Sequence, residues 1–176
     1  NNKNFLIPEI KSQKIKKNFV ISGVVKNKKI TLEDNDLEKI IDSKSFDVKF
    51  DKVVFASENQ FSFQLDKKFN LDKFVLKSSI SLDELILENR LALKKIFPKF
   101  KDKINLRDHK INLEYKKDFF SLEGAGKFFI KENDKINYKI TKKGKSIDFS
   151  TVLEVSNNQL KLDILNFQKK DKTNLK

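Results

Sequence analysis

The sequence predicts a mainly β protein, an antiparallel meander with one or two short helices. From Ile111 to Phe167, apolar residues occupy every second position for most of the length, and lysines, acids and amides fill most of the others. A period of two places alternate side chains on opposite faces of a strand, so one face is dry and the other is wet. The short loops between these runs also have lengths that keep the apolar residues of successive strands on the same face of the sheet.

Loop lengths test the strand assignment, because side chains that face each other across a hairpin lie on the same face. Two-residue loops at 117–118, 143–144 and 157–158 and a three-residue loop at 133–135 satisfy this rule and register five strands. Glycine and asparagine in such loops tolerate a positive φ. The predicted facing pairs are Tyr115 with Phe120, Leu113 with Leu122, Ile130 with Tyr138, Tyr138 with Phe149, Ile140 with Ile147, Val155 with Leu160 and Leu153 with Leu162.

The N-terminal part shows shorter runs of the same alternation. Residues 1–14 predict an edge strand, because Pro8 removes a backbone donor from the ladder. Residues 15–26 predict a strand that turns at 27–28, and residues 34–41 predict either a short capped helix or a loop with one apolar turn. Residues 46–63 predict two strands joined by a loop at 57–59, with a bulge near 51–52.

The stretch before the meander allows two interpretations. Residues 71–87 are predicted to be mostly extended, but a helical stripe over 82–97 competes, since the apolar residues there also recur at helical spacing. Pro98 is expected to end a helical turn formed by 91–97. No Gly-, Pro- or Ser-rich linker divides the chain, so residues 1–176 are predicted to be one continuous β-rich unit of about ten strands.

Composition points to a segment of a longer protein. The chain starts at Asn1 rather than at methionine, and its 17 phenylalanines accompany no tryptophan, methionine or cysteine. The absence of cysteine excludes disulfides and thiolate metal sites. No run approaches the roughly 18–20 apolar residues of a membrane helix. Any membrane anchor is therefore expected to lie outside this segment.

The net charge of +13 suggests a nucleic-acid partner at first, but its distribution argues against one. Only Arg90 and Arg107 among 38 basic residues are arginine, whereas phosphate and base recognition favours the bidentate guanidinium. The lysines alternate with apolar residues and mix with 25 acids. That pattern is typical of a solvated face, so no nucleic-acid partner is expected.

No catalytic or metal-binding motif stands out. His109 is the only histidine, and alternation places it on the apolar side, opposite Gly126. It lacks a clustered carboxylate or a nucleophile motif, so packing or solvent contact is the expected role, and no enzyme activity, metal or cofactor is predicted. Gly124 and Gly126 belong to the same row. They either leave room for a ligand or let the sheet curl tightly, or they mark a bulge or a bend around a packed core.

The apolar row must pack against another surface if it is to be shielded from water. Most strands supply a single apolar face, and no strong helical element is available to pack on it. A sheet folded over into a closed β-sandwich would bury this face, whereas a single curled sheet would leave an open apolar groove. The alternation alone fits both architectures.

Three segments carry a family resemblance. FFSLEGAGKFFI, INYKITKKGKSIDFSTVLEV and LKLDILNFQK resemble a repeat of the AsmA-like proteins, which are bridge-like lipid-transfer proteins of the YhdP and TamB type, and most of all the YhdP-like repeat. The shared elements are the glycine-flanked strand at 124–126, a Y-x-I-x-K-x-G hairpin at 138–144 and an L-x-L-x-x-L-x-F-x-K strand at 160–169. The resemblance covers residues 96–170 and is weak before them.

This resemblance implies an open, taco-like β groove, with the closed sandwich as the alternative. The groove would carry phospholipid between the inner and outer membranes from the periplasm, tethered by an inner-membrane anchor outside this segment and in contact with outer-membrane components. Lys143 beside the turn glycine departs from the family pattern and leaves lipid selectivity open. The expected acyl-chain contacts are Leu113, Tyr115, Phe120, Leu122, Phe128, Ile130, Ile136, Tyr138, Ile140, Ile147, Phe149, Leu153, Leu160, Leu162 and Ile164.

Overall fold

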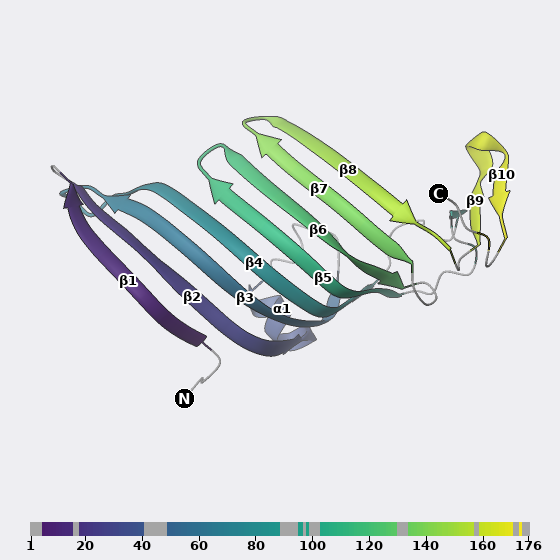
Figure 1. Ribbon diagram of the computed structural model, residues 1–176, viewed down its shortest axis with the longest axis horizontal. Coiled ribbons are helices and arrows are strands. Elements are labelled where there is room, and N and C mark those ends of the chain that lie inside the picture. Colours follow the sequence, from purple (N-terminus) through teal and green to yellow (C-terminus); the bar gives the residue numbers. More distant parts are fainter. Residues whose placement is uncertain are drawn as a thin grey trace.

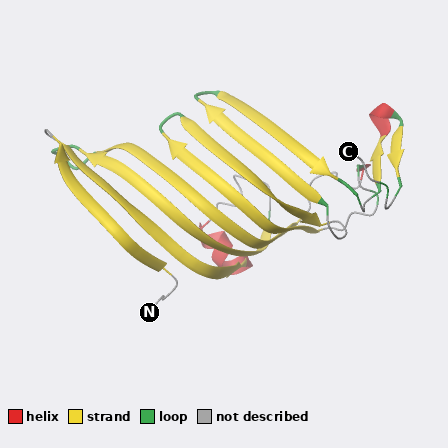
Figure 2. Cartoon of the chain, in the orientation of Figure 1, coloured by secondary structure: helices red, strands yellow, loops and turns green. Residues whose placement is uncertain are grey.

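A computed structural model describes residues 5–15, 18–40, 49–88, 95–96, 98, 103–129, 134–156, 159–170 and 173. Strands dominate these residues (Figure 2), and eight of them form one antiparallel sheet in chain order, from β1 at one edge to β8 at the other (Figure 1). The two edges do not pair with each other, so the sheet is curled but open. This confirms the predicted mainly β meander. The closed β-sandwich is wrong, because one sheet holds both the early and the late strands.

The eight strands of the sheet are long for a globular protein, in which about 5–6 residues are usual. Their bounds are β1 Phe5–Ile15, β2 Asn18–Glu33, β3 Phe50–Leu65, β4 Leu71–Glu88, β5 Lys103–Lys116, β6 Phe119–Phe129, β7 Lys135–Lys143 and β8 Ser146–Glu154. A short helix, α1 (Asp34–Ile40), follows β2, and Leu37 in it is buried. Of the two interpretations of residues 34–41, the short helix is thus confirmed over Asp34–Ile40.

Two predicted turns of the N-terminal part are wrong. The chain does not turn at 27–28 or at 57–59, because β2 continues through 27–28 with a bulge at 28–29 and β3 continues through 57–59, and the two strands pair with each other on both sides of the bulge. Asn27 faces Ser57, and Val25 faces Asn59. Small polar residues in a strand imitate the composition of a loop, and only the pairing with a neighbouring strand reveals them as strand residues. The helical stripe proposed for 82–97 is also wrong up to Glu88, since β4 is extended there.

The register of the C-terminal meander is partly as predicted. Tyr115 faces Phe120, which confirms the two-residue turn between β5 and β6. The turn between β7 and β8 lies one residue later than predicted, at 144–145. Gly144 has φ +57°, which glycine adopts without strain. Ile140 therefore faces Phe149 rather than Ile147. The predicted apolar side of the sheet is still correct, because residues 147 and 149 point to the same face of β8.

The other predicted pairings of Tyr138 are also wrong. Tyr138 faces Gly124 on one side and Thr151 on the other, rather than Ile130 and Phe149. The connection from β6 to β7 is longer than the predicted three-residue loop, since Lys127 already faces Lys135. Ile130 and the predicted loop residue Asn133 lie outside the described residues.

The fifth predicted strand does not join the sheet. Leu160 and Leu162 belong to a separate small hairpin, in which β9 (Leu160–Leu162) pairs with β10 (Phe167–Lys169) across the 3₁₀ turn η2 (Asp163–Leu165). The predicted pairs of Val155 with Leu160 and of Leu153 with Leu162 are therefore wrong. Alternation alone cannot distinguish a fifth strand of the meander from a local hairpin, because both have the same period.

Three strands carry a bulge at one level of the sheet. Phe55 of β3 faces Ile30 of β2 on one side and Leu82 of β4 on the other. Leu82 in turn faces His109 of β5. An extra residue bends its strand and increases the local twist, so bulges side by side curl the whole sheet. The register shifts beside this row lie at 28–29 in β2, 83 in β4 and 108–109 in β5.

The buried core lies at one end of the sheet. Ile104, Phe128 and Val155 are each 7% exposed or less and form one cluster. Leu160 of the small hairpin packs against this cluster, and Ser156 donates its backbone N–H to the carboxylate of Asp134. The chain after β8 thus closes this end.

We expect phenylalanines of the same sheet face to contribute very differently to stability. Phe128 is 7% exposed and Phe149 is 68% exposed. Phe128→Ala should lower the free energy of unfolding by about 3–5 kcal/mol, as for other buried phenylalanines, and Phe149→Ala by less than about 1 kcal/mol, as for surface sites. Urea unfolding followed by circular dichroism measures both changes in the free energy of unfolding. Equal losses would contradict a buried core that lies at one end of the sheet.

Candidate functional site

Most apolar residues of the eight-stranded sheet share one side. Residues that face each other in a ladder point the same way, so the register defines the side. Leu113 faces Leu122, Leu122 faces Ile140, and Ile140 faces Phe149, which makes one row across β5–β8. On the other flank Leu113 faces Ser78, and the row continues into β3 and β2. We call this side of the sheet the apolar face and the other side the polar face.

Most of the predicted contact residues lie on the apolar face. The register places Leu113, Tyr115, Phe120, Leu122, Phe128, Ile136, Tyr138, Ile140, Ile147, Phe149 and Leu153 there. The small hairpin carries Leu160 and Leu162, so these two do not extend the face as predicted. Ile164 falls in the turn η2, and Ile130 lies outside the described residues. That the placed residues bind a ligand stays a prediction.

Sequence reasoning missed the contribution of the N-terminal strands. A bulge changes the parity of the residues that face one side, so a strand that crosses it no longer shows simple alternation. In β5, for example, Ile111 and Leu106 lie on the same face although one number is odd and the other even. The missed residues of the apolar face include Ile21, Val25, Ile30, Val53, Phe55, Phe61, Leu76, Ile80, Leu82, Leu85, Leu87, Ile104 and Leu106.

The apolar face is closed at one end and uncovered at the other. At the closed end, Ile104 and Phe128 are buried against Val155. Toward the β5–β6 and β7–β8 turns, Tyr115 is 46% exposed and Ile147 is 66% exposed. Isolated exposed apolar residues are common, but a continuous exposed patch usually marks a binding surface.

A small polar cluster interrupts the apolar face in β2 and β3. Ser57 donates its hydroxyl to the side-chain carbonyl of Asn27, and Asn59 Nδ2 donates to Ser57 Oγ at 2.8 Å. Asn59 Nδ2 also lies 3.3 Å from the carbonyl of Val25. These bonds satisfy the amides within the sheet. The cluster therefore fixes the β2–β3 register, because a slip would leave buried polar groups without partners.

His109 sits in the β5 bulge and is 1% exposed. Its Nε2 lies 3.0 Å from the carbonyl oxygen of Lys127, and its Nδ1 lies 3.2 Å from the Tyr138 hydroxyl. A carbonyl only accepts, so Nε2 carries the proton and Nδ1 accepts from Tyr138 in the neutral ring. Burial lowers the pKa of His109, against smaller opposing effects of Lys127 and Asp108. The two hydrogen bonds and the burial describe a packed histidine without a reacting partner.

Two glycines make room for these rings. A Cβ on Gly126 would lie 2.2 Å from His109 Cδ2, and a Cβ on Gly124 would lie 2.4 Å from the Tyr138 ring. Both distances are shorter than any non-bonded carbon contact permits. The glycines thus let the His109 and Tyr138 rings lie flat on β6. Side chains of this chain thus fill the space beside both glycines.

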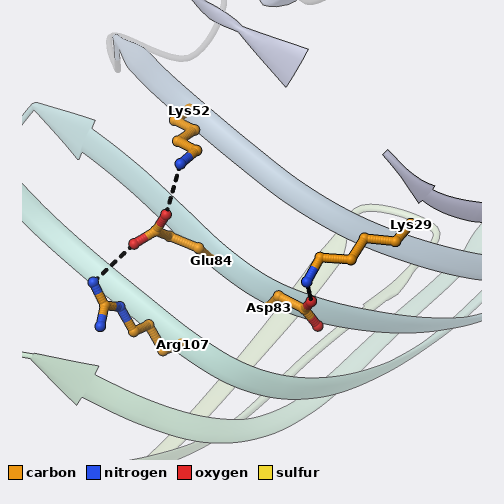
Figure 3. A network of polar contacts seen from close by, with 5 residues as sticks. All are labelled: Lys29, Lys52, Asp83, Glu84 and Arg107. Atoms are coloured by element: carbon orange, nitrogen blue, oxygen red, sulfur yellow. Dashed lines mark hydrogen bonds and ion pairs between the residues drawn. The ribbon is translucent and has the colours of Figure 1, made fainter. Parts of the chain in front are cut away.

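The polar face carries ion pairs between strands. Glu84 of β4 joins Lys52 of β3 at 3.1 Å and Arg107 of β5 at 2.9 Å, and Lys29 of β2 meets Asp83 of β4 at 2.5 Å (Figure 3). Burial opposes ionisation of Glu84, but its bonds to Lys52 and Arg107 outweigh burial and lower the pKa. These contacts connect the four strands β2 to β5 beside the bulges.

The hollows found on the described surface lie mainly on the polar face. A hollow of about 610 Å³ spans β3 to β6, and Glu58, Lys77 and Glu123 are among its lining residues. Such charged walls do not suit an acyl chain. Among the described residues, no three His, Asp or Glu side chains gather as metal ligands, and no helix is long and apolar enough to cross a membrane.

Comparison of the chain with family models, curated proteins and solved structures gives no match. The resemblance noted in the sequence thus remains a proposal, and the function has to be argued from the two faces of the sheet.

The His109–Gly126 contact predicts a specific non-additivity. Gly126→Ala should destabilise the protein by about 1–3 kcal/mol, because the new methyl group collides with the imidazole. In a His109→Ala background the same substitution should cost less than about 1 kcal/mol, since the ring is gone. Urea unfolding of the four proteins of this cycle measures the difference. An unchanged cost would mean that Gly126 is needed for another reason.

His109 also predicts a pH dependence of stability. Its folded pKa is lowered from the ordinary value of 6.5, so the unfolded chain binds more protons and stability rises with pH. The contribution is complete above about pH 6.5 and is lost as the pH falls toward the folded pKa. Wild type should therefore lose more stability than His109→Gln between about pH 7.5 and about pH 5.5. Parallel losses would contradict this assignment.

Proposed function

We propose that the chain is a section of a periplasmic lipid-transfer protein whose apolar face carries the acyl chains of phospholipid between the inner and outer membranes. The observation that supports this most is the apolar row across β5–β8, in which Leu113, Leu122, Ile140 and Phe149 face one another in turn and which is exposed near the β5–β6 and β7–β8 turns. An acyl chain needs an apolar surface and no specific hydrogen bonds. β5–β8 offer this surface.

The charge distribution supports the same function. Lysines are concentrated at the uncovered end of the apolar face, and the register places Lys142 on that face between Phe120 and Ile147. A phospholipid laid along the face would bring its phosphate near these ammonium groups while its chains contact the apolar residues. Other exposed lysines of the two turns are Lys116, Lys117, Lys143 and Lys145.

The dimensions suit a section rather than a complete conduit. Eight strands about 4.8 Å apart span roughly 35–40 Å. An envelope-spanning path needs more strands than these. The proposed tether to the inner membrane and the contact with outer-membrane components therefore belong to parts of the protein beyond this segment.

A second function, a structural or partner-binding β domain with a packed core and no lipid, is favoured by one observation. Ile104, Phe128 and Val155 already form a closed cluster, and a protein partner on the uncovered end would complete it. Native mass spectrometry of the purified chain distinguishes the two. Co-purified phospholipid supports the lipid path, and a ligand-free chain supports the structural domain.

The lipid path predicts crosslinking from one side of β8. Phe149 and Asp148 are adjacent and both exposed, but Phe149 points to the apolar face and Asp148 to the polar face. With phospholipid vesicles, a photocrosslinker at position 149 should capture lipid, and one at 148 should capture little. Phe149→Lys should reduce capture by a crosslinker at position 122, because a charge then interrupts the path.

Circular dichroism of each variant controls for loss of the sheet. A folded protein in which position 149 captures no more lipid than position 148 would show that the apolar face does not hold acyl chains.

A further inference from the structure

β8 is an edge strand with few of the features that usually prevent further pairing, since Asp148 and Glu154 are its only charged residues. Within the described residues it pairs only with β7, and all nine of its residues are exposed. Natural edge strands discourage added strands with lysines, prolines or bulges. The β8 sequence SIDFSTVLE contains no lysine, proline or glycine, and its ladder with β7 has no register shift.

The opposite edge, β1, is protected in the usual way. Pro8 lacks a backbone donor, and the register shifts between Leu6 and Glu9. Lys11 and Lys14 add exposed charge along the strand. The two edges of one sheet therefore differ: one is blocked against a new strand, and the other can accept one.

We propose that β8 pairs antiparallel with β8 of a second copy of this chain, with Ser150 on the two-fold axis. Ser150 is the central residue of the strand, so this register overlaps all nine residues of both copies. On the apolar face, Ile147 then faces Leu153 of the second copy. On the polar face, Asp148 faces Val152 of the second copy. Moving the axis to Thr151 would instead place Asp148 opposite Glu154, and like charges directly opposite are destabilising.

Charge along the strand also favours the antiparallel orientation. Lys143 ends β7, Lys145 lies in the turn before β8, and Glu154 ends β8. Antiparallel pairing brings the basic turn of one copy beside Glu154 of the other, whereas parallel pairing would bring the two basic turns together. The net charge of +13 on each copy opposes association, but salt at about 0.15 M screens charges more than about 8 Å apart.

The pairing would extend the apolar face across both copies. A two-fold axis between antiparallel edge strands stands normal to the sheet, so the apolar faces of both copies lie on the same side. Ile147 and Phe149, which are 66% and 68% exposed in the single chain, would gain neighbours across the new ladder. The pairing needs no lipid and is independent of the proposed transfer function.

The absence of cysteine allows a direct test of the axis. Ser150→Cys places two thiols opposite each other on antiparallel strands, where Cα atoms lie about 4.5–5.5 Å apart, within the range of a disulfide. Under mild oxidation this variant should form a covalent dimer of twice 20.6 kDa. Ser12→Cys, an exposed serine on the other edge strand, is the matched control and should stay largely monomeric.

A second variant tests association without a crosslink. Sedimentation equilibrium of the wild-type chain at about 100 µM should give a reversible dimer. Ser150→Lys should abolish it, because two lysines would meet on the axis, and Ser12→Lys should not. The proposal would be overturned by a monomeric wild type, by equal crosslinking of both cysteine variants, or by crosslinking of position 150 only to position 12. Lipid capture at position 149 remains measurable in the Ser150→Lys monomer.

Discussion

Cross-strand pairing is the constraint on which the rest of this structure depends. Facing residues in an antiparallel ladder must point to the same side, so each row of facing residues stays on one side of the sheet across all its strands. In the row through Leu113, Leu122 and Ile140, every step is a ladder pair. This constraint yields a sheet with two chemically different faces, one apolar and one covered by lysines and acids.

The bulges turn this two-faced sheet into a curled one. They lie side by side at the level of Phe55, Leu82 and His109, so their bends add instead of cancelling. Each bulge also changes the parity of its strand and keeps apolar residues on the same face on both sides of the bend. His109 is buried there because Gly126 leaves space for its ring. The buried packing of His109, the ion pairs between strands and the curvature of the sheet thus occur in the same region of the fold.

The consequence is a sheet with two unlike ends and two unlike edges. The cluster of Ile104, Phe128 and Val155 closes one end, while the other end leaves apolar side chains in solvent. The β1 edge carries Pro8 and a bulge, while the β8 edge carries neither. An apolar surface that is left open on one end and extendable at one edge suits a protein that works as part of a larger apolar path. The proposed lipid transfer and the proposed β8 pairing both follow from this asymmetry.

The sequence by itself determined the fold class, the meander order of β5 to β8 and the side to which most apolar residues of these strands point, because a period of two is a local property. Tertiary structure decided the rest. Asn27 and Ser57 resemble turn residues and lie in continuous strands, since their hydrogen-bond partners come from a neighbouring strand. Leu160 has strand alternation but pairs within its own hairpin. The bulges made the apolar face of the N-terminal strands unrecognisable from the sequence. The extra residue of a bulge can be identified only by comparison with the partner strand, which lacks it.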